Sequence, residues 1–250
     1  MNTQIVDTFR ATLSQNPART TAVAAAAVLG ISVPLLVSNY RAYIALGPGG
    51  IPHNIVGWLI SLTAKIFSRE TRDTRIYDLD ADKEHWLDPS AIPERRGSRP
   101  IPSWHPIPHR QLDRIPSAEI QQRLAGVFNA RLAANPGLVE MATSPHERTS
   151  DGLIIHHALK SPHAVADKSA REIAHLHPHK DYSMHVTCAP QDCKILIERG
   201  WGERHPLSGT PAIPKEYFLI YAPRDQEELD VVERVFVASI GYMTGHRDAK

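Results

Sequence analysis

The stretch of this sequence that most restricts how the chain folds is a run of uncharged, mostly apolar residues near its amino terminus. No charged residue occurs between Arg19 and Arg41, and residues 21–40 read TAVAAAAVLGISVPLLVSNY. An α-helix rises about 1.5 Å per residue, so this run is long enough to cross the ~30 Å hydrocarbon core of a bilayer. The run predicts a single transmembrane helix, with a secretory signal and a buried helix of a soluble domain as the alternatives.

A second apolar segment follows, in which large apolar side chains recur at helical spacing: Ile55, Trp58, Leu59, Leu62 and Ile66. This spacing predicts a helix whose apolar face either packs in a core or lies at the membrane surface. Basic residues are denser after the first run than before it, so the positive-inside tendency predicts that the body of the protein faces the cytosol. The membrane expected for this single-pass anchor is that of the endoplasmic reticulum. We therefore expect a tail and membrane anchor over residues 1–45, an amphipathic helix over 46–70 and a catalytic domain over 71–250.

The composition of the 250-residue chain excludes some partners. Its 28 basic and 27 acidic residues leave a formal net charge of +1, and a chain without a basic excess is not expected to bind nucleic acid. The two cysteines, Cys188 and Cys193, flank an expected strand-to-helix turn, which favours a reducing compartment. Prolines crowd residues 89–116 and predict an irregular, extended connection there.

The remaining sequence mixes helix and strand signals. Ser117 has the position of a helix N-cap, Pro190 opens a short helix, and Asp225 begins a final helix with a capping box completed three residues later. Residues 152–160 and 217–222 have the apolar character of strands. The final helix is expected to bury a stripe made of Leu229, Val232, Phe236 and Ile240. Together these elements predict an α+β fold, an antiparallel sheet with flanking helices, preceded by the transmembrane helix.

The segment REIAHLHPHKDYSMH, residues 171–185, is expected to form a hairpin. With a loop over residues 178–182, His175 lies opposite His185, and the strand alternation places His177 on the same face. The same alternation places Glu172 on the opposite, core side, and His179 falls in the loop.

The three aligned histidines have three interpretations. Imidazole is a common metal ligand, but the hairpin has no carboxylate at an obvious ligand spacing, so we expect no metal. Alternatively the side chains are half-buried polar residues of a sheet face. Proton transfer in a pocket is the third interpretation and the preferred one, because histidine titrates near cellular pH. The nearby segment GWGERHPLSG adds Trp201, Arg204 and His205, residue types that suit a flat, oxygenated, anionic ligand.

Several of these motifs occur in the same order in a known family. The segments REIAHLHPHKDYSMH, GWGERHPLSG, YAPRDQEEL and ASIGYMT closely resemble the fungal luciferase family, and RIYD and GSRP resemble it further upstream. The resemblance spans roughly residues 70–244, and it includes luciferase-like relatives from fungi that emit no light. A hydrophobic anchor before the domain is also similar to that of the family.

The resemblance implies an enzyme that oxidises 3-hydroxyhispidin, a styryl-pyrone, with molecular oxygen, releasing carbon dioxide and light. It implies oxygen as a co-substrate and no other cofactor, a small-molecule pyrone or phenolic substrate, and membrane lipid as the partner of the anchor. The expected base is a histidine among His175, His177, His185 and His205, with Arg204 stabilising the enolate. The expected substrate-binding residues are Trp201, Tyr221, Glu172 and Asp181. The alternatives are a dark paralogue acting on another phenolic or pyrone metabolite, with a metal in some versions, and a non-catalytic binder of small aromatics.

Overall fold

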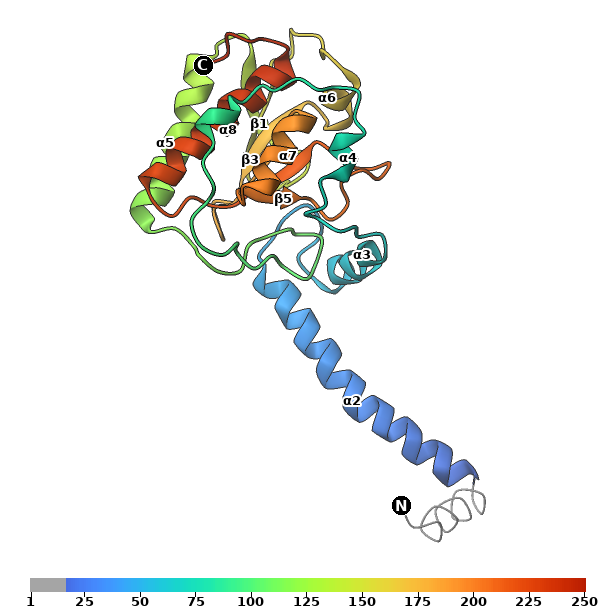
Figure 1. Cartoon of the computed structure of the whole chain (residues 1–250). Coiled ribbons are helices and arrows are strands. Elements are labelled where there is room, and N and C mark those ends of the chain that lie inside the picture. The colour runs from blue at the N-terminus through green and yellow to red at the C-terminus, as the bar shows by residue number, and fades with distance from the viewer. Residues whose placement is uncertain (1–16) are drawn as a thin grey trace. The chain divides into compact units, whose positions relative to one another are not determined.

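The structure, a computed structural model, describes residues 17–250, so most of the tail expected before the anchor lies outside the described residues. The chain divides after Ala45 into two compact units. The first unit is the helix α2 (Pro17–Ala45), and the second, from Leu46 to Lys250, contains the sheet (Figure 1).

Helix α2 confirms the helix predicted near the amino terminus. Residues 18–45 are long and apolar enough to cross a membrane, and Pro34 lies inside the helix without ending it. Length and composition support a membrane anchor, although a signal sequence near the amino terminus has the same properties. The helix is therefore a candidate anchor.

The second unit is built on one six-stranded sheet in which every neighbouring pair of strands is antiparallel, with the order β1-β2-β3-β4-β6-β5. The strands are β1 (Val139–Thr143), β2 (Asp151–Ile155), β3 (Glu172–Leu176), β4 (Met184–Thr187), β5 (Gly202–Arg204) and β6 (Tyr217–Ile220). This sheet and its helices confirm the predicted α+β class.

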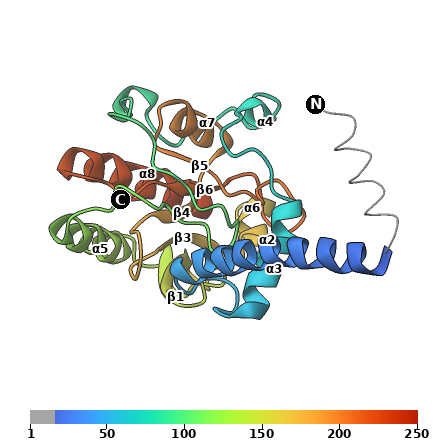
Figure 2. The same cartoon turned by 90° about the horizontal axis from the view of Figure 1, so that it is seen from below.

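Helices cover one face of the sheet and surround its edges. Helix α8 packs on β3 and β4 and lies beside α5, where the Phe236 and Phe128 rings stack 4.9 Å apart (Figures 1 and 2). Helix α7 packs against β5. The helices of this unit are α3 (Ile55–Ile66), α4 (Arg75–Asp78), the 3-10 turn η1 (Pro89–Ala91), α5 (Ala118–Ala134), α6 (Ala164–Lys168), α7 (Pro190–Glu198) and α8 (Gln226–Thr244).

The two faces of the sheet have different environments because side chains alternate along each strand. Ile173, Val186 and Phe218 point into the hydrophobic core between the sheet and the helices, and the predicted stripe of α8 is buried there. The opposite face carries His175 and His185 and is covered by loops rather than by long helices. The core thus fixes the sheet, and the sheet presents its polar face to the loops.

Several predicted boundaries and faces differ from those observed. The strand expected over residues 152–160 ends at Ile155, the strand expected over 217–222 ends at Ile220, and β1 and β5 had no strand prediction. Helix α3 forms as predicted but buries Trp58, Gly57 and Ser61. The apolar residues predicted to share the face of Trp58 do not all follow it inward: Ile55 is 58%, Leu59 52% and Ile66 78% exposed.

The N-cap of α8 provides a test of local structure. Asp225 Oδ1 accepts a hydrogen bond from the Glu228 amide at 3.0 Å, but the Glu228 carboxylate accepts from the Arg224 amide instead of closing the predicted capping box. Asp225→Ala is expected to lower the free energy of unfolding by about 1 kcal/mol, measured by urea unfolding. Asp225→Asn keeps the cap and loses only an exposed ion pair to Arg96, so a loss as large as that of the alanine variant would contradict the cap's role.

Candidate active site

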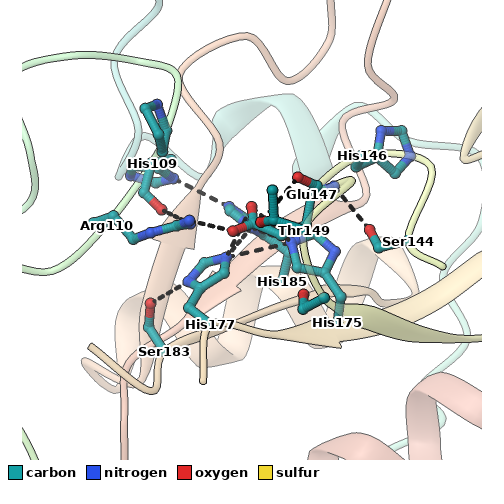
Figure 3. A network of polar contacts seen from close by, with 12 residues as sticks. His109, Arg110, Ser144, His146, Glu147, Thr149, His175, His177, Ser183 and His185 are labelled. Carbon is teal, nitrogen blue, oxygen red and sulfur yellow. Dashed lines mark hydrogen bonds and ion pairs between the residues drawn. The ribbon is translucent and has the colours of Figure 1, made fainter. Parts of the chain in front are cut away.

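Three histidine side chains from the β3–β4 hairpin meet in the interior of the second unit (Figure 3). His175 lies opposite His185 in the register, and the His177 amide donates to the Ser183 carbonyl at 3.0 Å, as predicted. His177 Nε2 is 3.3 Å from His175 Nε2, and His185 Nδ1 is 3.3 Å and 3.2 Å from the same two atoms. We call these three residues the histidine triad.

A buried carboxylate contacts the ring nitrogen of His175 that points away from the other two histidines. We call this nitrogen of each ring the outer nitrogen, and the one that faces the other rings the inner nitrogen. Glu172 Oε1 lies 2.8 Å from His175 Nδ1, so Glu172 is on the histidine face and not on the core face that strict alternation predicted. The reason is a β-bulge: Leu153 pairs with Ala174 but Ile154 pairs with Glu172, which leaves Ile173 as an extra residue. Gly152 makes room for this carboxylate, since a Cβ there would lie 2.6 Å from Glu172 Oε1.

The outer nitrogen of His177 is held in a similar way. Its Nδ1 lies 2.9 Å from Ser183 Oγ and 3.4 Å from Asp181 Oδ1. The Ser183 hydroxyl donates to Asp181 Oδ2 at 2.5 Å, and the Gln111 amide donates to the same oxygen at 2.7 Å. Because the Ser183 hydroxyl donates its hydrogen bond to Asp181, its oxygen accepts the hydrogen bond from His177 Nδ1.

His185 is connected to a third carboxylate through another histidine. His185 Nε2 lies 3.4 Å from His109 Nδ1, and His109 Nε2 lies 3.2 Å from Glu203 Oε1. Glu203 also accepts from the Tyr221 hydroxyl at 2.9 Å and pairs with Arg72 at 3.2 Å. His109 therefore donates from Nε2 and accepts at Nδ1, so His185 donates from Nε2.

These contacts assign the protons of the triad. Each histidine carries its proton on the outer nitrogen, so the three inner nitrogens face one another with unshared electron pairs, and their short contacts are not hydrogen bonds. Burial, followed by the charge of Arg110, lowers the pKa of His177 to about 4. Burial and the neighbouring His177 hold the pKa of His185 well below its usual value. Both residues are therefore neutral at cellular pH.

The carboxylates behind the triad remain ionised. Burial acts to raise the pKa of the Glu172 carboxyl, but the charge and hydrogen bond of His175 outweigh it, so its pKa lies below the ordinary value. Burial is also the largest single influence on the Asp181 carboxyl and acts to raise its pKa, but the contacts with His177, Arg110 and Ser183 together lower it. Ionised carboxylates keep the outer imidazole nitrogens protonated and the inner nitrogens available as acceptors.

An ion pair from two loops closes the site. Arg110 Nη2 forms a hydrogen-bonded ion pair with Glu147 Oε1, donates to the Pro48 carbonyl at 3.1 Å, and its Nε is 4.0 Å from Asp181 Oδ1. Glu147 Oε2 lies 3.9 Å from His175 Nε2, so this carboxylate faces the triad (Figure 3). Gly49 is needed for this approach, because a Cβ there would lie 2.5 Å from Arg110 Nη2.

A cavity of about 330 Å³ opens onto these groups. Its lining includes His175, His185, Arg110 and Glu147, and Tyr217 forms a flat wall whose ring stacks on that of His185 at 4.9 Å with 13° between the planes. The volume lies in the range of small-molecule sites. A larger hollow of about 530 Å³ lies along α8 near Trp86, but it lacks the convergent histidines and buried carboxylates, so we assign the chemistry to the smaller cavity.

The site residues predicted from the second segment have different positions. His205 lines the cavity, but its Nδ1 accepts from the Leu207 amide at 3.1 Å and the Pro106 carbonyl also bonds its ring, so it has no free nitrogen for a substrate proton. Arg204 Nη2 donates to the Glu70 carbonyl at 2.5 Å, away from the cavity lining. The physical reason is the unpredicted strand β5, whose alternation turns Glu203 toward the histidines and Arg204 away.

The two predicted aromatic residues also lie outside the cavity lining. The Trp201 indole donates to the Pro93 carbonyl at 2.6 Å and packs in the hydrophobic core. Tyr221 stands behind Glu203 and contacts the site only through that carboxylate. Glu172 and Asp181 lie close to the histidines but are not part of the cavity wall. Glu172 is hydrogen-bonded to the outer nitrogen of His175, and Asp181 is linked to that of His177 through Ser183. His179 is exposed in the hairpin turn.

Sequence reasoning missed five residues of the site: His109, Arg110, Glu147, Glu203 and Tyr217. His109 and Arg110 belong to the proline-rich connection, which is irregular as predicted and covers the histidine face. The adjacent histidine and arginine in this proline-rich run were the available signal. Glu147 lies in the loop between β1 and β2 and gave no local signal.

Comparison with known proteins decides the family. A family model described as "Luciferase domain" matches residues 170–239. The chain is 36% identical to a luciferase of Armillaria mellea over 89% of this chain and 86% of that protein. It is 35% identical to a luciferase of Armillaria ostoyae over 90% of this chain and 88% of that protein, and 34% identical to one of Neonothopanus nambi over 93% and 91%.

The chain belongs to the fungal luciferase family. The matched luciferase domain contains the histidine triad, Glu172 and Glu203, whereas Arg110 and Glu147 lie before it in the sequence. Residues outside the matched range thus complete the site of this family member. No solved structure matches the chain.

Proposed function

We propose that this chain oxidises 3-hydroxyhispidin with molecular oxygen, releasing carbon dioxide and light, at the cavity above the histidine triad. The observation that carries the proposal is the triad itself: three buried imidazoles with acceptor nitrogens turned inward, beside a guanidinium, in a chain of the luciferase family. A hydroxypyrone must become an electron-rich enolate before it reacts with oxygen. A histidine that lines the cavity accepts the enol proton, and positive charge at the triad favours the enolate that forms.

The cavity residues have distinct tasks in this proposal. The substrate's enol oxygen lies near the triad, and the Arg110 guanidinium and the positive charge at the triad stabilise the negative oxygen that forms. The wall made by Tyr217 receives the flat ring of the substrate. The electron-rich ring carbon bonds to oxygen, the resulting cyclic peroxide loses carbon dioxide, and the excited product emits light. Burial of the triad excludes water from these steps.

The carboxylates act on the imidazoles and do not contact the substrate. Glu172, Asp181 and, through His109, Glu203 orient the three rings and fix which nitrogen carries the proton. Glu172 and Asp181, which the sequence predicted to bind the substrate, position the imidazoles in this proposal instead. Arg110 takes the role that the sequence assigned to Arg204.

The deciding experiment supplies 3-hydroxyhispidin to the full chain in microsomes and records oxygen uptake and photon emission together. Both signals are expected, with one oxygen consumed per substrate, and neither is expected from microsomes lacking the chain. Oxygen uptake without light would remove the emission from the proposal and leave a dark oxygenase. If folded protein, shown by cooperative thermal unfolding, gave neither oxygen uptake nor light, 3-hydroxyhispidin would not be its substrate.

We also propose that the chain is anchored in the endoplasmic reticulum membrane by α2, with the catalytic unit in the cytosol. The charge-free span and the basic residues after it support this orientation. Protease added to intact microsomes is expected to digest the second unit. Protection of that unit until detergent is added would place it in the lumen.

Helix α3 is expected to bind the membrane surface on its own. Its exposed side and the following residue are apolar: Val56 is 54%, Ile60 42% and Phe67 63% exposed. A chain starting at Leu46, which lacks α2, is therefore expected to sediment with phosphatidylcholine vesicles. Replacing both Ile66 and Phe67 by serine removes about 1.5–3 kcal/mol of apolar transfer per side chain, so binding is expected to weaken at least about tenfold.

The control for this prediction is Leu79→Ser. Leu79 is 88% exposed and follows α4, so it is equally apolar and accessible but outside α3. Equal loss of vesicle binding in this variant would show a non-specific effect of surface apolarity and would contradict a role for α3.

A further inference from the structure

The inner nitrogens of the histidine triad lie close together, and in neutral imidazoles their electron pairs repel one another. His175 Nε2, His177 Nε2 and His185 Nδ1 lie 3.2–3.3 Å apart, and each carries an unshared electron pair. Three such pairs repel one another unless a positive charge lies among them. The hydrogen bonds to Glu172, Ser183 and His109 prevent the rings from turning a donor inward.

The spacing of the nitrogens matches the coordination sphere of a transition metal. An ion bound by imidazole at about 2.0–2.1 Å in tetrahedral geometry holds its nitrogen ligands about 3.3–3.4 Å apart. The three distances in the triad are 3.3, 3.3 and 3.2 Å, so the triad forms one nearly equilateral face of such a site. An ion slightly outside the plane of this face would contact all three nitrogens.

The surroundings of the triad are those of metal-binding histidines. Such histidines donate their second ring proton to a carboxylate or to a group held by one, which raises the basicity of the ligating nitrogen. His175 does so to Glu172 at 2.8 Å, and His177 to Ser183, which is itself bonded to Asp181. His185 reaches Glu203 through His109.

The buried carboxylates around the triad carry more negative charge than the neighbouring arginine balances. Glu147, Glu172 and Asp181 are 6%, 1% and 1% exposed, and Arg110 is the only Lys or Arg in ion-pair distance of them among residues 17–250. Three carboxylates against one guanidinium leave an excess of two negative charges beside the triad. Buried charges without partners are costly, and a divalent cation balances this excess.

A proton is a poor substitute for that cation. A single shared proton satisfies only two of the three inner nitrogens, because a hydrogen bond joins one donor to one acceptor. A metal ion satisfies all three.

We propose that His175, His177 and His185 bind a divalent first-row transition metal ion, with Glu147 as the fourth ligand. Glu147 Oε1 is held by Arg110, and its Oε2, at 3.9 and 4.0 Å from His175 Nε2 and His177 Nε2, is a short side-chain movement from the ion. Imidazole and carboxylate together suit zinc, iron, manganese or copper. The proposal replaces the expectation of a metal-free site, which considered only the hairpin and so did not include Glu147.

The metal site does not depend on the proposed substrate. His175, His185 and Glu147 line the cavity, so an ion held by them would be accessible from it to neighbouring oxygens of a hydroxypyrone or of another enolic metabolite. Two other histidine groups are less suited. His205 has both nitrogens engaged, and the group of Glu140, His156 and His157 lies at the surface, where Glu140 already pairs with His157 at 2.7 Å.

The test measures metal and not turnover. The full chain is purified in detergent with a tag that contains no histidine, and its transition-metal content is determined by elemental analysis. We expect about one ion per chain. His177→Ala is expected to lower this content at least about tenfold, and Glu147→Gln to weaken retention against a chelator. His157→Ala, in the surface group, is expected to keep the full content.

A second measurement covers the case in which His177→Ala does not fold, judged by its thermal unfolding. Wild-type chain stripped by chelator is titrated with Co²⁺, and we expect saturation at about one equivalent with visible absorption bands of low-coordinate cobalt, displaced by Zn²⁺. The proposal is overturned if folded wild-type chain contains no transition metal and takes up no Co²⁺. It is also overturned if the content falls in His157→Ala and persists in folded His177→Ala. A metal-bearing chain that is dark with 3-hydroxyhispidin would refute only the proposed function.

Discussion

Alanine in place of His185 is expected to lower oxygen uptake and light emission with 3-hydroxyhispidin by about 10²–10⁴-fold. His185 Nδ1 is one corner of the triad, and its Nε2 connects the triad to His109 and Glu203, so the substitution removes both the inner nitrogen and the link behind it. Initial rates of both signals, measured on the full chain in microsomes and divided by the amount of chain, give the effect.

The matched control is His179→Ala. His179 belongs to the same hairpin but is exposed in its turn, outside the cavity lining. Its rates are expected to equal those of the unsubstituted chain. If His185→Ala retained more than about a tenth of either rate, the triad would not be the reacting site.

The histidine face of the hairpin was predictable because it depends on local rules. Strand side chains alternate in direction, and a hairpin loop of fixed length sets the pairing, so residues 171–185 determined that His175 meets His185. The α5 and α8 boundaries were predictable for a similar reason, since Ser117 and Asp225 cap them as their side chains indicate. These features need only neighbouring residues.

The position of Glu172 was not predictable by the same rules. Strict alternation assigned it to the core, and the bulge against Leu153 and Ile154 reversed that assignment. Bulges arise from the fit of two strands and leave little trace in the sequence of one. Because the bulge brings Glu172 to His175, one irregular residue changed a core side chain into part of the site.

Trp201 and Arg204 lie outside the cavity lining, and residues 202–204 form a strand that the sequence did not predict. Because β5 pairs with β6, side-chain alternation points Glu203 toward His109 and Arg204 toward the Glu70 carbonyl. The cation of the site comes instead from Arg110, more than ninety residues before Arg204, in a connection without regular structure. Contacts between loops distant in sequence depend on the whole fold, so no local pattern indicates them.

Methionine in place of Arg110 is expected to lower the free energy of unfolding by about 3–5 kcal/mol. Arg110 is 2% exposed and Glu147 is 6% exposed, so removing the guanidinium leaves Glu147 ionised and unpaired among buried groups, with Asp181 also losing its nearest arginine. The Pro48 carbonyl loses a hydrogen bond as well. Urea unfolding of the full chain in detergent, followed by tryptophan fluorescence, measures the loss.

Two variants separate this electrostatic cause from loss of packing. Arg96→Met breaks the ion pair between Arg96 and Asp225, whose side chains are 63% and 44% exposed, and is expected to cost about 0–1 kcal/mol. Adding Glu147→Gln to Arg110→Met removes the unpaired charge, so the double variant is expected to recover much of the lost stability. If the double variant were as unstable as Arg110→Met alone, the guanidinium would act through its packing and hydrogen bonds, and the ion pair would not be what holds the loops over the histidine triad.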